Sequence, residues 1–192
     1  MEIFRLWING IAQPFNMAAR LADKTHPTLG LMAVVIRFTI TSLTTVLALY
    51  WLGRMPFAPS EWVILPAEKY YFAEMFFLPL WGLAIWMLMS SLAYLILRLT
   101  NANSDFDQIL NIIGIGMLIP MPFVWLWDWI AIALNIYTVM NQAFTHSVAQ
   151  TWEATIQAIC FVKILKIQPA LSILLVVLIN ALYIGLAMHI IR

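Results

Sequence analysis

The chain has 192 residues, of which 64% are hydrophobic and only 10% are charged, and its formal net charge is +1. A soluble domain of this length is usually nearer half apolar and a quarter charged, so most of the excess apolar surface is expected to face lipid. The charge balance and the lack of a long basic run argue against a nucleic-acid partner, and the single Cys160 excludes an intrachain disulfide and a cysteine metal cluster.

Residues 1–29 are predicted to form a cytoplasmic amphipathic segment. The apolar residues of its first helix fall on one face at helical spacing: Ile3, Phe4, Trp7, Ile8 and Ile11. This pattern is typical either of a helix that lies in the headgroup region of a membrane or of a helix docked on a bundle. Pro14 is expected to end that helix, and residues 16–24 are compatible with a second short helix. The start lacks the long apolar core and the small-residue cleavage site of a signal peptide.

Residues 30–192 are predicted to form an all-α membrane bundle of five transmembrane helices. One crossing needs about 20 apolar residues, and the expected spans are about 30–52, 73–97, 109–125, 148–164 and 169–191. Glu74 is expected in the first turn of the second span, where the helix dipole favours a carboxylate. Pro79 lies inside the same span and predicts a kink.

The third span contains the pair Gly114-Ile-Gly116. A dinucleotide-binding fingerprint requires a third glycine and a preceding strand, whereas here a capping-box pattern, Ser104 with Asp107, precedes an apolar helix. The two glycines are therefore candidate helix-packing positions that let a neighbouring helix approach closely. Pro120 follows them and is expected to bend or end the helix.

The segment from Ile130 to Gln150 leaves the topology open. It is apolar enough for a re-entrant or interfacial helix, and its amide side chains make a clean crossing less favoured. If it did cross, the chain would have six spans and both termini inside. With five spans, the positive-inside rule favours a cytoplasmic N-terminus and an outside C-terminus. The inner segments would carry Arg5, Arg20, Lys24, Arg98, Lys163 and Lys166, and the outer ones Arg54, Lys69 and Arg192.

Five polar residues inside the spans are candidate functional residues, Arg37, Asn111, Glu153, Lys163 and Asn180, and the first three are the preferred ones. Arg37 is expected to snorkel to the cytoplasmic headgroups, and pairing inside the bundle is the alternative. Glu153 is expected to reach water near the outer end of a short span, and the alternatives are pairing with Arg37 or lining a polar cavity. Ala181 and Gly185 form a second candidate packing face, because small residues four apart allow close helix approach.

The sequence predicts neither an enzyme nor a cofactor or metal site. The three histidines, His26, His146 and His189, lie in separate segments without a zinc-binding motif. The nucleophile motifs of hydrolases and penicillin-binding proteins are absent as well. No pair of catalytic groups deep in adjacent spans indicates an intramembrane protease.

Several prolines, glycines and aromatic residues occur in a characteristic order along the chain. They are Pro14-Phe15 and Leu29-Gly30 in the lead, Tyr71-Phe72 and Pro79-Leu80 in the second span, the loop from Asn103 to Gln108, Gly114 and Ile119-Pro120 in the third span, and Trp152 and Lys163 around the fourth. This layout resembles the YIP1 family of five-span membrane proteins and is most similar to its small prokaryotic members. The chain departs from it at Asn101-Ala-Asn103, where members of the family often have glycine.

The resemblance implies an all-α integral protein of the prokaryotic cytoplasmic (inner) membrane with a cytoplasmic N-terminus. Eukaryotic relatives act in vesicle trafficking and membrane shaping. The expected function is accordingly that of a non-enzymatic scaffold, assembly factor or membrane-organising protein. Its expected partners are membrane lipids, together with other membrane proteins or a second copy of the chain. The alternative is a small transporter or lipid-handling protein with a polar cavity near Arg37, Asn111 and Glu153, and an intramembrane enzyme is the least favoured reading.

Overall fold

A computed structural model describes residues 2–57, 65–102 and 104–190. Over these ranges the secondary structure is helical without a strand, so the prediction of an all-α chain is confirmed. Four helical segments are long and apolar enough to cross a membrane: Thr28–Trp51, Ala67–Leu99, Phe106–Ala133 and Pro169–His189. The expectations for Asn103, Ile191 and Arg192 fall outside the described residues.

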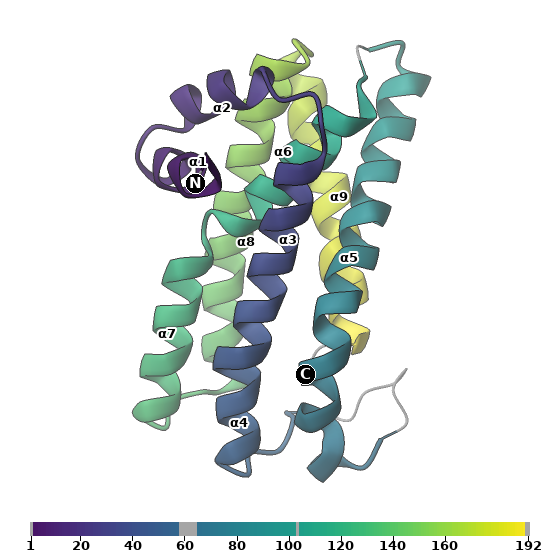
Figure 1. Cartoon of the computed structure of the whole chain (residues 1–192). Helices are drawn as coiled ribbons and strands as arrows, with labels where there is room; N and C mark the ends of the chain where they lie inside the picture. Colours follow the sequence, from purple (N-terminus) through teal and green to yellow (C-terminus); the bar gives the residue numbers. More distant parts are fainter. Residues whose placement is uncertain (1, 58–64, 103, 191–192) are drawn as a thin grey trace.

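Two short helices, α1 (Glu2–Ala12) and α2 (Pro14–Ala22), lie across one end of the bundle (Figure 1). Pro14 starts α2, at a position where the missing N–H of proline costs no helical hydrogen bond. Ile3 and Leu6 of α1 are buried against the rest of the chain. The amphipathic N-terminal segment formed by α1 and α2, here called the lead, is therefore docked on the bundle. Docking was one of the two interpretations of its sequence pattern.

The first long helix consists of α3 (Thr28–Thr41), the π-helical segment η1 (Ser42–Val46) and α4 (Leu47–Trp51). Hydroxyl groups around η1 donate to backbone carbonyls four residues earlier. The pairs are Thr41 to Arg37 at 2.9 Å, Ser42 to Phe38 at 2.9 Å and Thr44 to Ile40 at 2.7 Å. Such bonds compete with the backbone ladder and loosen it, which gives a physical reason for the wider π-helical turn at this place.

The second long helix, α5 (Ala67–Leu99), has 33 residues and continues through Pro79. At 1.5 Å per residue it is about 50 Å long, more than the hydrocarbon core of a bilayer needs. The helix begins at Ala67 rather than near residue 73, so the first turn holds Glu68 and not Glu74. The prediction of Glu74 as a first-turn, dipole-stabilised carboxylate is therefore wrong, and Glu74 is only 1% exposed.

The loop that follows α5 reverses the chain with asparagine instead of glycine. Asn101 has φ 53°, the left-handed conformation that asparagine tolerates better than most residues. The next helix is capped by Asp105, whose side chain accepts a hydrogen bond from the Gln108 backbone N–H at 3.1 Å. The predicted cap at Ser104 is therefore off by one residue.

The third expected span is two helices, α6 (Phe106–Leu118) and α7 (Met121–Ala133). Pro120 lies between them and cannot donate the backbone hydrogen bond that a continuous helix would need. The prediction that Pro120 bends or ends the helix is confirmed, whereas the predicted end of the span at residue 125 is wrong, because α7 continues to Ala133.

The fourth long helix, α8 (Val139–Ile164), starts nine residues before the predicted residue 148. Asn135, with φ 58°, follows the end of α7, and the Thr138 hydroxyl accepts from the Asn141 backbone N–H at 3.3 Å to cap α8. Residues 130–150 therefore do not form one separate helix. They comprise the end of α7, a turn and the first half of α8.

The five long helical segments run along the bundle in alternating directions, ending with α9 (Pro169–Ile190) (Figure 1). The lead helices and the last turns of α9 consequently lie toward opposite ends of the molecule. The C-terminal ends of α5 and α8 lie at the end where α1 and α2 pack, and they carry Arg98 and Lys163.

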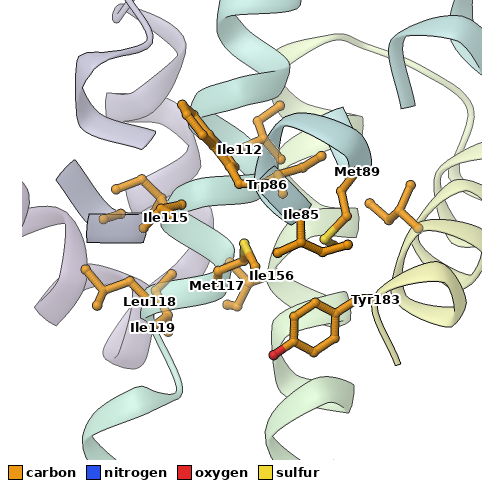
Figure 2. Close-up of a cluster of buried hydrophobic side chains, with 14 of the residues drawn as sticks. Ile85, Trp86, Met89, Ile112, Ile115, Met117, Leu118, Ile119, Ile156 and Tyr183 are labelled. Carbon is orange, nitrogen blue, oxygen red and sulfur yellow. The ribbon is translucent and has the colours of Figure 1, made fainter. Parts of the chain in front are cut away.

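Helix α6 is the centre of the bundle. Residues 109–118 are all buried, because α3, α5 and α8 pack around this helix. Figure 2 shows this core, in which Ile112 of α6 lies near Trp86 of α5 and Met117 of α6 lies near Ile156 of α8. The Trp86 indole N–H also donates to the Leu110 carbonyl oxygen at 2.9 Å, so the packed aromatic ring has a polar partner.

Candidate functional site

The structure brings Arg37 and Glu153 together as an ion pair inside the bundle. Arg37 Nη1 donates to Glu153 Oε2 at 2.9 Å, and the two side chains are 7% and 1% exposed. The same Nη1 donates to the Met117 carbonyl oxygen at 2.9 Å, and Nη2 donates to the Tyr183 hydroxyl at 3.2 Å. The guanidinium carbon also lies 5.1 Å from the centre of the Phe38 ring. One arginine on α3 is thus bonded to α6, α8 and α9.

A chain of amides extends this cluster through α8 into α9. Gln157 Nε2 donates to Glu153 Oε1 at 3.0 Å, and Asn180 Nδ2 donates to Gln157 Oε1 at 3.1 Å. Gln157 is fully buried and Asn180 is 6% exposed. Both carboxylate oxygens of Glu153 therefore have a donor, as a buried charge requires.

The break between α6 and α7 supplies one of the partners of Arg37. The last four carbonyls of a helix have no partner within the helix, and Met117 is among them because α6 ends at Leu118. Ile119 lies in the same break, and its carbonyl accepts from the Trp7 indole N–H at 3.3 Å. The helix break at Pro120 thus leaves two carbonyl groups free to accept hydrogen bonds, one from an arginine of α3 and one from a tryptophan of the lead.

Two expectations about the ion pair are corrected by this geometry. Arg37 does not snorkel to the headgroups, because a carboxylate, a carbonyl and a hydroxyl hold its guanidinium inside the bundle. Glu153 does not reach water, because it lies near the middle of the 26-residue α8 and not near the outer end of a short span. The alternative of pairing inside the bundle is the one observed.

Asn111 makes its hydrogen bonds at a different place in the bundle from Arg37 and Glu153. Its Oδ1 accepts from the Gly30 backbone N–H at 2.8 Å, and its Nδ2 donates to the His26 and Lys24 carbonyls at 2.8 and 3.3 Å. Gly30 is the third residue of α3, where N–H groups lack helical partners. A fully buried side chain of α6 therefore caps α3 and fixes the link that precedes it.

Gly114 lies where α3 and α6 meet backbone to backbone. A Cβ atom on Gly114 would be 2.6 Å from the Gly30 Cα atom, and a Cβ on Gly30 would be 2.9 Å from the Asn111 Cα atom. Gly116 faces the ion-pair cluster, since a Cβ there would be 2.6 Å from Gln157 Cγ. The lack of side chains at these positions sets how closely the helices approach.

Ala181 and Gly185 do not pack against another helix of the described chain. Both residues are exposed, and a Cβ on Gly185 would meet nothing within 4 Å. The small residues of α9 thus lie on its outer face, whereas Gly114 and Gly116 lie on inner faces.

Arg37, Glu153 and the residues hydrogen-bonded to them form a polar core that can hold the helices together. The sequence alone identified only some of these residues. Gln157, Tyr183 and Gly30 were not among the candidates, although an amide or a glycine in an apolar helix is a readable signal. No group of three or more His, Cys, Asp or Glu that could hold a metal occurs within the described ranges. The buried arginine and glutamate neutralise each other and bind neighbouring backbone and side chains.

Comparisons of the chain with family models, with curated proteins and with solved structures found no match. The fold and the polar core are therefore the basis for assigning a class: an all-α chain with four candidate membrane-spanning helices, which indicates an integral membrane protein.

Proposed function

We propose that this chain is a non-enzymatic integral membrane protein of the YIP1 type, which organises a membrane or a membrane assembly through helix and lipid contacts. It crosses the bilayer five times, with α1 and α2 in the cytoplasmic headgroup layer. The observation that carries the proposal is the docked lead. It lies across one end of the bundle (Figure 1), and several of its apolar side chains are exposed.

The outer surface of the lead suits an interface between water and lipid. Its exposed apolar residues are Phe4, Ile8 and Phe15, with exposed fractions of 46%, 65% and 58%. Arg5 and Arg20 are exposed on the same two helices. Apolar groups with neighbouring arginines favour burial in the headgroup region of an anionic membrane. A platform at one end only would affect one leaflet.

Helix α8 is proposed as the fifth crossing although it falls outside the four apolar candidates. Its charged and amide residues near the middle, Glu153 and Gln157, are buried and bonded within the bundle. Its exposed hydroxyls donate to carbonyls four residues earlier, with distances of 2.7 Å for Ser147, 2.8 Å for Thr151 and 2.8 Å for Thr155. Side chains that bond inward or to their own helix leave few polar groups to be desolvated by lipid.

The transporter alternative would need Arg37, Asn111 and Glu153 to face water in a common cavity. Arg37 and Glu153 are instead buried against each other, and Asn111 is occupied at the start of α3. Because these polar groups are already hydrogen-bonded between helices, they support the scaffold over the transporter.

Reconstitution into anionic vesicles tests the proposal. The native chain is expected to produce smaller or tubular vesicles, and the triple variant Phe4→Ser, Ile8→Ser, Phe15→Ser is expected to lose this effect while it stays folded. A matched triple variant at the other end of the bundle, Leu52→Ser, Leu134→Ser, Ile136→Ser, removes exposed apolar groups as well and is expected to keep the effect. Identical vesicle shapes for the native chain and the lead variant would contradict the proposal.

A further inference from the structure

A second buried polar cluster lies at the end of the bundle opposite α1 and α2. Thr45 of η1, Asp128 of α7 and Gln142 of α8 come together there, with exposed fractions of 3%, 2% and 7%. The Thr45 hydroxyl donates to Asp128 Oδ2 at 3.1 Å. Three separate helical segments thus direct oxygen-bearing side chains to one place, and none of these side chains bonds to Arg37 or Glu153.

Several buried polar atoms of this cluster lack hydrogen-bond partners among the described residues. Asp128 Oδ1 and both amide atoms of Gln142 make no hydrogen bond of good geometry with the described residues, although the Gln142 side chain lies close enough to Asp128 to favour its charged form. The described part of the chain also contains no salt bridge to Asp128. A buried carboxylate without a counter-charge is strongly unfavourable, so a ligand that satisfies these atoms would stabilise the fold.

A buried tyrosine and an open cavity occur at the same end of the bundle. Tyr137 lies in the turn between α7 and α8, and burial, followed by the charge of Asp128, raises the pKa of its hydroxyl well above the ordinary value. Tyr71 lines an open cavity of about 380 Å³ beside Arg54 and Glu68. Arg54 is itself bonded to Asn135 in the turn before α8.

We propose that Asp128, Gln142 and Thr45 form a binding site for a small monovalent cation such as Na⁺. The site offers one carboxylate and two neutral oxygen groups, so its charge matches a single positive charge. Calcium sites usually contain several carboxylates, and transition metals prefer nitrogen and sulfur ligands, which the three side chains do not provide. The π-helical segment that carries Thr45 is a feature often found at functional sites.

The site is independent of the proposed scaffold function, since it uses none of the lead residues and none of the Arg37 cluster. A bound cation would neutralise Asp128 and occupy the free oxygens of Asp128 and Gln142.

Thermal unfolding of the purified chain in detergent tests the site. Replacing choline chloride by NaCl at equal ionic strength is expected to raise the Tm by about 5 °C when Na⁺ is far above its Kd. Asp128→Asn and Gln142→Leu are expected to abolish this shift, and Thr45→Val to reduce it. Thr44→Val is the matched control, because within the described ranges the Thr44 hydroxyl bonds to the Ile40 carbonyl of its own helix, and it is expected to keep the shift.

Binding of radiolabelled sodium to the same variants gives a readout that does not depend on their stability. Saturable binding by the native chain and by Thr44→Val, with loss in Asp128→Asn, supports the site. The proposal is overturned if NaCl has no effect on the native chain, or if Asp128→Asn retains the effect. It is equally overturned if infrared spectra show a protonated carboxylic acid that disappears in Asp128→Asn and does not respond to Na⁺.

Discussion

Arg37 and Glu153 lie 116 residues apart in the chain and form an ion pair of 2.9 Å in the interior of the bundle. The pair joins α3 to α8, and its other hydrogen bonds reach α6 and α9. Removal of either partner would leave the other charge buried and unpaired. The stability of the bundle should therefore depend on the pair much more than on any single charge at its surface.

Arg37→Met should destabilise the protein by about 3–5 kcal/mol, because Glu153 then lacks its counter-charge in an apolar environment. The double variant Arg37→Met, Glu153→Leu should recover much of this loss, since neither charge remains. Unfolding in a denaturing detergent, followed by circular dichroism, measures both effects. Lys163→Met, at an exposed position, is the control and should change little. Additive losses in the double variant would show that the two side chains do not depend on each other.

Gly114→Ala should destabilise the fold by about 1–3 kcal/mol, because the added methyl group overlaps the backbone of α3 at Gly30. Gly185→Ala is the matched control on α9, where the methyl group meets open space, and should be neutral or slightly stabilising. The same unfolding assay compares them. Equal losses for the two variants would contradict the close approach of α3 and α6.

Asn111→Leu should increase hydrogen exchange at the Gly30 amide. The substitution removes the acceptor of that N–H and the donor to the His26 and Lys24 carbonyls, and an unsatisfied buried N–H costs about 1–3 kcal/mol. Since about 1.4 kcal/mol corresponds to a factor of ten, exchange should accelerate roughly tenfold or more. Hydrogen exchange of the peptide that contains Gly30, read by mass spectrometry, gives the rate. An unchanged rate would mean that Asn111 does not cap α3.

Trp7→Phe should loosen the lead while leaving the bundle intact. The variant keeps most of the apolar contact but loses the hydrogen bond to the Ile119 carbonyl, at a cost of about 1 kcal/mol. Limited proteolysis should cut the lead at Arg20 faster than in the native chain. Phe4→Leu, at a position that is 46% exposed, provides the comparison and should not change the cleavage rate. The hydrogen bond has no such role if the two variants are cut equally fast.

The sequence was sufficient for the elements whose signal is local. Uniform apolar composition predicted α9, and helical spacing of apolar residues predicted the amphipathic lead. Pro120 marked the boundary between α6 and α7 because proline has no N–H. The conformation of Asn101 also explains an asparagine at this turn, because asparagine, like glycine, tolerates a positive φ.

The polar core was harder to predict because its partners are distant in sequence. Glu153 and Gln157 made α8 look like a short and impure span, since their hydrogen-bond partners lie on α3 and α9. For the same reason, the start of α8 was predicted too late in the chain. Asn141 and Gln142 suggested an interfacial segment, although Gln142 is buried. Asp128 lies in an apolar run between two tryptophans, and nothing nearby in the sequence indicates Thr45 as its partner.

The central claim is that α8 crosses the membrane, and cysteine labelling at its two ends tests this claim most directly. Leu134→Cys and Gln168→Cys place exposed thiols just before and just after α8, and the native Cys160 is buried. With intact cells, a membrane-impermeant maleimide should label Leu134→Cys from outside, and Gln168→Cys only after the cells are opened. Labelling of both positions from the same side would contradict the crossing of α8 and the five-pass topology.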